Sequence, residues 1–280
     1  MKVVVTGSSG LLGRHVAAAL AGAGHAVLGL DMAPPPASAG WDHVTADLTD
    51  LGPTLQLVRN ADSVIHLAAI PRPTGLPGGQ VFKTNMAAVY NVVEAAVLNG
   101  ATRLVYASSM SVLGYPFFET PIEPTYVPFD AAHPVAPQDA YALSKWLGEE
   151  VVDAAVRRRP ALSAVSLRMP WIQTAATFAR EVVARRARAA LVARDLWAYL
   201  DARDAATAFV AAVERPIDRH QRLFISAADT FAETETTELV RAAYPRTVIK
   251  RALTGYETVF DLSEARAVLG FVPKFRWRDY

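Results

Sequence analysis

Tyr141 and Lys145 stand four residues apart in a segment, 138–158, whose apolar spacing predicts a helix. Positions four residues apart differ by about 40° around a helix axis, so both side chains lie on one face. A phenol is a poor base at neutral pH, but a nearby ammonium ion stabilises the phenolate and lowers its pKa. The pair is therefore a candidate for moving the proton of a substrate hydroxyl, although the same spacing is common on exposed helices that do no chemistry.

Serine side chains follow the predicted strand 103–108, at the point where that strand ends. A hydroxyl in this position can donate a hydrogen bond to a substrate oxygen that is being oxidised or reduced. The alternative is that the serines satisfy backbone groups at the end of the strand. From the residues alone, three of them compete for the first role: Ser108, Ser109 and Ser111.

A glycine-rich turn, TGSSGLLG at positions 6–13, separates a predicted strand at 3–6 from a predicted helix at 11–23. The first glycine permits a tight turn, the second lets the backbone approach a pyrophosphate, and the third allows close packing of helix on strand. Unpaired N–H groups at the start of the helix favour the binding of a phosphate. The alternative interpretation is a tight turn that binds no ligand. The residues expected around the phosphates are Gly7, Ser9, Gly10, Leu11, Leu12 and Gly13.

Asp31 ends the second predicted strand, 26–30, and lies 18 residues beyond Gly13. A carboxylate in this place accepts hydrogen bonds from the hydroxyls of an adenosine ribose and repels a 2′-phosphate. The next residues are Met32, Ala33 and Pro34, so no arginine stands there to receive that phosphate. The sequence therefore predicts NAD rather than NADP, and the alternative is a solvated loop carboxylate.

Strands and helices alternate along the first part of the chain. Strands are predicted at 3–6, 26–30, 43–46, 63–69, 103–108 and 162–169, and helices at 11–23, 79–99 and 138–158, with a further helix entered through Pro53. Strands joined by helices of this length need right-handed crossovers in a parallel sheet that is covered on both faces. The predicted fold class is α/β, a Rossmann-type doubly wound parallel sheet.

Beyond Pro170 the alternation weakens, with helices predicted at 174–193, 201–214, 234–243 and 263–269 and one strand at 222–226. We expect an NAD-binding domain at 1–170 and a small α+β substrate lobe at 171–280 packed on it, with some sheet-edge elements shared. The segment 115–137 contains six prolines, and a loop of this length beside an α/β sheet is expected to border a ligand. Arginines in the stretch 180–194 are expected to form a solvated face, or else to meet a substrate phosphate or carboxylate.

Composition excludes several classes of function. The 280 residues are 52% hydrophobic and 20% charged, which is typical of a folded domain, and the net charge of +1 provides no basic field for nucleic acid or an anionic membrane. The chain has no cysteine, its six histidines lack metal-ligand spacing, and no G-x-S-x-G hydrolase motif occurs, so no metal is expected. With no signal peptide and no apolar run of about 18 residues, a cytoplasmic location is expected.

Five motifs occur together along the chain: the T-G-x-x-G-x-x-G turn, Asp47-Leu48, His66-Leu67-Ala68-Ala69, Asn85 and Tyr141-x-x-x-Lys145. In this order they resemble the extended short-chain dehydrogenase/reductases, and within them the NAD-dependent epimerase/dehydratase family. The resemblance is clear over residues 2–170 and looser over 199–213. It implies that Ser109, Tyr141 and Lys145 are catalytic, and that NAD is also contacted by Asp47, Leu48, Leu67, Ala68, Ala69, Asn85, Tyr141, Lys145 and Pro170.

The resemblance also implies an NAD-dependent oxidoreductase acting on a sugar, sugar acid or similar polyol, with Tyr141 as acid and base. Family members that bind nucleotide sugars commonly carry an Asn and a Gly-Pro after the sixth strand, where this chain reads RMPWIQ at 168–173. Leu113 also stands where the family usually has Tyr. The alternatives are a nucleotide-sugar epimerase or dehydratase that retains NAD, and a catalytically silent NAD-binding regulator. The side chains expected at the substrate are Ser111, Trp171 and Gln173, although Trp171 would alternatively close the core between the lobes.

The predicted helices 79–99 and 138–158 carry more apolar residues than one face of a sheet needs. In the family this pair of helices forms a two-fold symmetric interface, so a homodimer is expected. The apolar residues are Met86, Val89, Val92, Val93, Val97, Leu143, Trp146, Leu147, Val151 and Val152.

Overall fold

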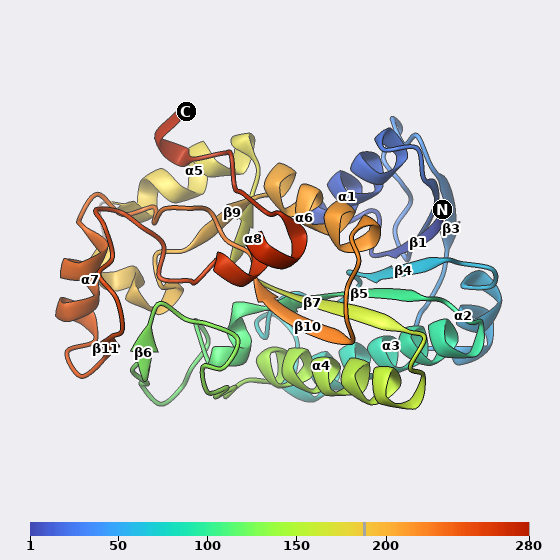
Figure 1. The fold of residues 1–280 in the computed structure, drawn as a ribbon, viewed down its shortest axis with the longest axis horizontal. Helices are drawn as coiled ribbons and strands as arrows, with labels where there is room; N and C mark the ends of the chain where they lie inside the picture. The colour runs from blue at the N-terminus through green and yellow to red at the C-terminus, as the bar shows by residue number, and fades with distance from the viewer. Residues whose placement is uncertain (187–188, 280) are drawn as a thin grey trace.

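A seven-stranded sheet forms the centre of the molecule (Figure 1). The computed structural model describes residues 1–186 and 189–279, and the side chains of residues 183–191 lie outside that description. The strand order is β10-β7-β5-β4-β1-β2-β3, and every neighbouring pair is parallel. The strands are β1 (Lys2–Thr6), β2 (Ala26–Asp31), β3 (Asp42–Thr45), β4 (Ser63–His66), β5 (Arg103–Ser109), β7 (Ser163–Met169) and β10 (His220–Phe224). The order reverses between β1 and β4, which confirms the predicted Rossmann-type fold.

Helices cover both faces of the sheet, as Figure 1 shows. On one face α1 packs against α6, and on the other α3 packs against α4 and α2. Their bounds are α1 (Leu11–Gly22), α2 (Leu51–Leu57), α3 (Gly78–Leu98), α4 (Ala140–Arg158) and α6 (Ala202–Glu214). The predicted strand 63–69 is too long, because the N–H groups of Leu67 and Ala68 turn to the Thr6 side chain after β4 ends at His66.

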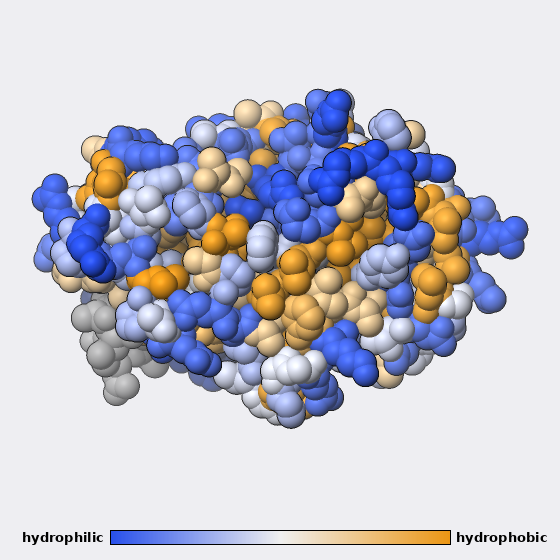
Figure 2. Space-filling model, turned by 90° about the horizontal axis from the view of Figure 1, so that it is seen from below, coloured by the Kyte–Doolittle hydropathy of each residue, from blue (hydrophilic) through white to orange (hydrophobic). Residues whose placement is uncertain are grey.

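The face formed by α3 and α4 is more apolar than a solvated helix pair needs to be. Figure 2 shows it from below Figure 1, with apolar side chains gathered over its centre. Half of the apolar residues that these helices were expected to present are instead buried inside the chain, under the sheet: Val89, Val92, Val93, Val97 and Val152. The others are half-buried: Met86, Leu143, Trp146, Leu147 and Val151.

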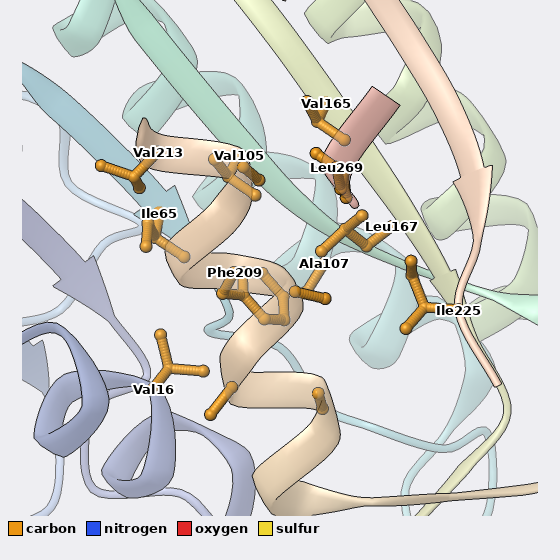
Figure 3. Packing of buried hydrophobic residues seen from close by; sticks show 14 of the residues in the cluster. Val16, Ile65, Val105, Ala107, Val165, Leu167, Phe209, Val213, Ile225 and Leu269 are labelled. Atoms are coloured by element: carbon orange, nitrogen blue, oxygen red, sulfur yellow. The ribbon is translucent and has the colours of Figure 1, made fainter. Parts of the chain in front are cut away.

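The main core lies between the sheet and the layer of α1 and α6. Successive strand residues point to opposite faces, so Val105 and Ala107 of β5 join this core while Leu104 and Tyr106 join the one under α3 and α4. Figure 3 shows Phe209 of α6 lying over the strands, among side chains that come from β4, β5 and β7. Both faces of the sheet are therefore apolar, and polar chemistry is confined to its edges and strand ends.

A third core holds together the part of the molecule beyond the sheet. It contains large aromatic side chains, and two small sheets border it, β6 (Tyr126–Val127) with β11 (Val248–Ile249) and β8 (Trp171–Gln173) with β9 (Tyr199–Asp201). The remaining elements are η1 (Met110–Leu113), α5 (Ala175–Arg186), η2 (Ala189–Asp195), α7 (Thr236–Ala243), α8 (Ser263–Leu269) and η3 (Trp277–Asp279). The predicted helix 174–193 and the arginine stretch fall partly on residues outside the described part of the chain.

The boundary expected at residue 170 is crossed in both directions. β6 comes from the proline-rich segment and pairs with β11, whereas β10 comes from the later part of the chain and completes the large sheet. The two parts of the chain therefore exchange elements across the expected boundary. Their division into a cofactor domain and a substrate lobe stays a prediction.

Two glycines of α1 give a matched test of the close packing at the glycine turn. A Cβ at Gly13 would lie 1.9 Å from the Gly7 carbonyl oxygen, whereas a Cβ at Gly22 would meet nothing within 4 Å. We expect Gly13→Ala to destabilise the fold by about 2 kcal/mol or more and Gly22→Ala to leave stability equal or slightly higher. Urea unfolding measures both, and a Gly13→Ala midpoint equal to that of the wild type would refute the packing argument.

Candidate active site

The glycine turn packs directly against the end of β4. Gly7 has a φ of +70°, and a Cβ on it would lie 2.7 Å from the Ala68 nitrogen. A side chain is thus excluded at Gly7 by its backbone conformation and by its neighbours. Gly10 is exposed, and a Cβ there would approach only the Gly7 carbonyl oxygen, at 3.2 Å. The surface of the turn at Gly10 is therefore open to a ligand.

The start of α1 and the end of β2 together fit a dinucleotide. No side chain caps α1, so N–H groups of its first turn are available to a phosphate. Asp31 accepts hydrogen bonds from the Ser9 nitrogen at 3.0 Å and the Ala33 nitrogen at 2.9 Å. A carboxylate has about four acceptor sites, so Asp31 retains capacity for ribose hydroxyls.

The residues expected around the adenine lie on a loop that α3 holds in place. Asp47 is exposed, and its Oδ1 accepts from the Thr49 nitrogen at 2.9 Å and hydroxyl at 2.8 Å, contacts that lower the pKa of Asp47. Leu48 is buried, and its carbonyl accepts from Asn91 at 3.0 Å. The contact from Asn91 of α3 thus fixes the loop through its backbone at Leu48, and the Asp47 side chain bonds within the loop.

Asn85 ties the loop after β4 to helix α4. Its Oδ1 accepts from the Ile70 nitrogen at 2.8 Å, and its Nδ2 donates to the Ile70 carbonyl and to the Ser144 hydroxyl, both at 3.1 Å. Ser144 in turn donates to the Tyr141 carbonyl at 2.7 Å. Asn85 therefore holds together segments that carry predicted cofactor and catalytic residues, and its contact with the nicotinamide half stays a prediction.

Tyr141 and Lys145 lie in the first turns of α4. Asp139 caps this helix, accepting from the nitrogens of Tyr141 at 2.8 Å and Ala142 at 2.9 Å. Lys145 is buried, and its Nζ donates to the Ala107 carbonyl of β5 at 2.7 Å and lies 5.7 Å from the centre of the Tyr141 ring. The two side chains share one face of the helix, as their spacing predicts.

The predicted lowering of the Tyr141 pKa is wrong for this structure. Burial raises the pKa of Tyr141 to about 12; a hydrogen bond with Ser109 opposes this effect, and the negative charge of Asp139 adds to it. Burial also lowers the pKa of Lys145 to about 8, opposed by the charge of Glu149. The loss of water around the phenol outweighs the nearby ammonium ion, so both groups carry their protons at neutral pH.

The three serines at the end of β5 have different surroundings. Ser108 donates to a buried carboxylate oxygen of Glu149 at 2.6 Å. Ser109 lies close enough to Tyr141 to lower its pKa, and its Oγ accepts from the Ser111 nitrogen at 3.1 Å. Ser111 is buried, and among the described residues its hydroxyl finds no partner. Of the three, only Ser109 therefore stands beside the tyrosine hydroxyl.

The segment after β7 runs beside these groups, since Met169 pairs with Ser109 in register. Pro170 is buried, and Trp171 is half-buried against the aromatic core beyond the sheet, which leaves both interpretations of this tryptophan open. Gln173 is 1% exposed, and its Oε1 has no hydrogen-bond partner within the described part of the chain. Like Ser111, it has unused hydrogen-bonding capacity in a buried position.

Three further side chains at this edge have surroundings that the sequence does not show, and Phe117 among them is not singled out by the sequence reasoning. The Phe117 ring lies edge-on to Tyr141, with centroids 6.5 Å apart, and the proline content of its loop was the signal that a ligand is near. His66 hydrogen-bonds the Thr6 hydroxyl at 2.8 Å, and burial and the charge of Lys145 lower its pKa to about 3, so it is neutral. Arg168, an alternative substrate contact, forms a buried ion pair with Glu149.

Two kinds of site find no support in the structure. No cluster of three or more potential metal ligands occurs among residues 1–186 and 189–279. Within the same residues, no helix is long and apolar enough to cross a membrane.

Comparison with known proteins identifies relatives that share part of the chain. L-Arabinose 1-dehydrogenase (NAD(P)(+)) of Haloferax volcanii is 31% identical over 179 residues, which are 62% of this chain and 68% of that protein. Uronate dehydrogenase of Pseudomonas putida is 29% identical over 54% of this chain, and GDP-mannose 3,5-epimerase of Arabidopsis thaliana is 32% identical over 54%. The chain spans only 53% and 42% of the lengths of these two proteins.

Solved structures share the fold over the whole chain. MoeE5 in complex with UDP-glucose and NAD has a TM-score of 0.75 and 24% identity, covering 100% of this chain and 95% of that one. The model of the NAD dependent epimerase/dehydratase family matches residues 3–225. These matches confirm the predicted family, the NAD cofactor and an enzymatic function of the short-chain dehydrogenase type. The chain belongs to the NAD dependent epimerase/dehydratase family.

Proposed function

We propose that the protein catalyses reversible hydride transfer between NAD and a carbinol or carbonyl carbon of a sugar, sugar acid or similar polyol. The observation that carries the proposal is the arrangement on one face of α4, where the buried Lys145 Nζ lies 5.7 Å from the centre of the half-buried Tyr141 ring, with Ser109 close enough to influence the Tyr141 pKa. NAD, when bound, accepts or supplies the hydride. Gly7, Gly10 and Asp31 are assigned to hold it, which leaves the proton to the side chains of α4 and β5.

Tyr141 is assigned the proton transfer in both directions. With a pKa of about 12 the phenol is protonated at neutral pH, so it can donate to the alkoxide that develops when a carbonyl is reduced. In the oxidative direction the phenolate form of Tyr141 accepts the substrate hydroxyl proton and becomes the phenol, and the Lys145 ammonium and the Ser109 hydroxyl stabilise that phenolate before the transfer. Ser109 also donates to the reacting substrate oxygen in this assignment.

A sugar-like substrate agrees with the side chains expected at the site. Ser111 and Gln173 have buried polar atoms that bond no other described residue, which suits the hydroxyl groups of a polyol. Phe117 and Trp171 offer aromatic faces to its C–H groups. Relatives named as L-arabinose 1-dehydrogenase and uronate dehydrogenase support a free sugar or sugar acid.

A nucleotide-sugar epimerase is the second candidate, because GDP-mannose 3,5-epimerase of Arabidopsis thaliana is also a relative. Mass spectrometry of the protein as purified distinguishes the two, since an epimerase cycle regenerates its own NAD and keeps it bound. Retained NAD supports the epimerase, and its absence supports the dehydrogenase. A catalytically silent regulator is disfavoured because Tyr141 and Lys145 are both present. A cytoplasmic location stays a prediction.

We also propose that the enzyme is a homodimer through α3 and α4. Half-buried apolar side chains lie on both helices, among them Met86 and Leu147, and α3 carries the exposed Tyr90 and Leu98, 52% and 61% accessible. Association of two chains would remove this apolar area from water, which favours the dimer.

Tyr141→Phe tests the proton-transfer role. It removes one hydroxyl and keeps the ring, so we expect kcat to fall by about 10²–10⁴-fold while the Kd for NAD stays within about twofold. The matched control is Tyr90→Phe, which deletes the same atom from an exposed tyrosine of α3 and should leave kcat unchanged. Turnover is followed with a panel of aldoses and uronates, and wild-type turnover in Tyr141→Phe would disprove the mechanism.

Asp31→Ala tests the choice of cofactor. Loss of a charged acceptor to the ribose hydroxyls should weaken NAD binding by about 1–3 kcal/mol and improve NADP binding relative to it. Asp42→Ala removes an exposed carboxylate from the neighbouring β3 and should change neither affinity. Calorimetric titration gives both constants, and equal affinity of the wild type for NAD and NADP would rule out the assignment.

Leu147→Glu tests the proposed interface. Light scattering at micromolar concentration should give twice the 30.2 kDa chain mass for the wild type and the single chain mass for this variant. Val248→Glu alters an exposed apolar residue of β11, 58% accessible, and should remain dimeric. A monomeric wild type would contradict the proposal.

A further inference from the structure

Glu149 is a fully buried carboxylate on the catalytic helix. It follows Tyr141 and Lys145 at the same four-residue spacing and therefore lies on the same face of α4. The chemistry proposed above gives it no role. A buried carboxylate is costly unless its charge is compensated, so its partners indicate what it does.

Four hydrogen bonds reach this carboxylate from three neighbouring strands. Arg168 of β7 donates through Nε to Oε1 at 2.9 Å and through Nη2 to Oε2 at 2.7 Å. Ser108 of β5 donates to Oε1 at 2.6 Å, and Arg222 of β10 donates to Oε2 at 3.1 Å. Ser108 directly precedes Ser109, and Arg168 stands two residues before Pro170. Glu149 thus joins α4 to the ends of the strands that carry the site.

Burial opposes the positive charge of Lys145, and its neutral neighbours offset this only in part. Burial favours the neutral amine and His66 of β4 carries no charge, whereas the rings of Tyr106 and Tyr141, whose centres lie 5.1 and 5.7 Å from Nζ, attract a cation weakly. Arg168 and Arg222 lie beyond Glu149 and repel a cation. Among the described groups, Glu149 is the carboxylate whose charge opposes these effects, together with the Ala107 carbonyl that accepts from Nζ.

We propose that Glu149 is a positioning residue that keeps Lys145 as an ammonium ion beneath Tyr141 and fixes α4 against the ends of β5 and β7. The inference rests on the proposed function for its catalytic meaning, but its physical content concerns Lys145 alone. A buried ion pair is weak evidence for stability, because apolar replacements are often as stable. The negative charge of Glu149 matters instead because it favours the ammonium form of the neighbouring Lys145.

The direct test is the titration of Lys145 by NMR in protein labelled at lysine. The chain has five lysines, so Lys145→Arg identifies the signal by its disappearance. The wild type should titrate with a pKa of about 8. Glu149→Gln removes the charge at nearly constant shape, and the Lys145 pKa should fall by about one unit or more. Glu149→Asp keeps the charge and should keep most of the wild-type value.

Arg222→Gln removes a positive charge from the same cluster, so its expected effect on the Lys145 pKa is opposite to that of Glu149→Gln. Arg222 is partly exposed, with 26% of its side chain accessible, and its loss removes a repelling charge while leaving the carboxylate in place, so the Lys145 pKa should rise. An unchanged Lys145 pKa in Glu149→Gln would overturn the inference. If Glu149→Gln does not fold, Arg222→Gln decides: a rise of the Lys145 pKa would support the inference, and a pKa that stays or falls would overturn it.

Kinetics separate this inference from the proposed function. A fall of about one unit reduces the ammonium population at pH 8 by about fivefold, so kcat/KM of Glu149→Gln should decline at lower pH than in the wild type and recover towards pH 6. A merely structural role would lower activity equally at every pH. If Tyr141→Phe retains turnover, the proposed function fails, while the Lys145 titration, made without substrate or NAD, still decides the role of Glu149.

Discussion

A buried positive charge at the ends of the central strands is the constraint on which the site depends. The Lys145 Nζ is held on the Ala107 carbonyl at 2.7 Å, inside a sheet whose two faces are apolar. An ammonium ion in such a place needs compensation, because burial disfavours its charged form. The Ala107 carbonyl of β5 and the buried carboxylate of Glu149 oppose the effect of burial on that charge, and Arg168 and Arg222 hold the carboxylate in place.

The same edge gathers its other parts through hydrogen bonds of neutral side chains rather than through charge. Thr6 accepts from the nitrogens of Leu67 and Ala68, which joins the glycine turn to the end of β4, and Asn85 joins the following loop to α4. Parallel strands bring these segments to one edge, although they are far apart in sequence. The chemistry is consequently positioned by strand order and helix caps, and the lobe beyond the sheet closes the site with side chains from both halves of the chain.

Local patterns predict much of this arrangement. The glycine spacing, Asp31 at a strand end and the four-residue step from Tyr141 to Lys145 depend on short stretches of sequence, and each appears in the structure where it was expected. The pKa of Tyr141 was predicted in the wrong direction, because the extent of burial depends on packing that spacing does not show. For the same reason, half of the apolar residues expected at an interface lie inside the chain.

The network around Glu149 could not be predicted from the sequence. Its partners come from positions 108, 168 and 222, and they meet only because β10, β7 and β5 are adjacent in the sheet. No short motif encodes that order. Likewise, Phe117 reaches Tyr141 through a loop whose path is set by its contacts, among them the bonds of Thr120 to Gln138 at 2.9 Å.

The central claim is hydride transfer from a sugar carbon to the nicotinamide, and the fate of a carbon-bound deuterium tests it most directly. Aldoses and uronates deuterated at their carbinol carbons are incubated with the enzyme and NAD, and the cofactor is analysed by mass spectrometry. The account predicts deuterium on the reduced nicotinamide and none released to water, because a hydride does not exchange with solvent. Deuterium released to water while NAD remains unreduced would contradict it.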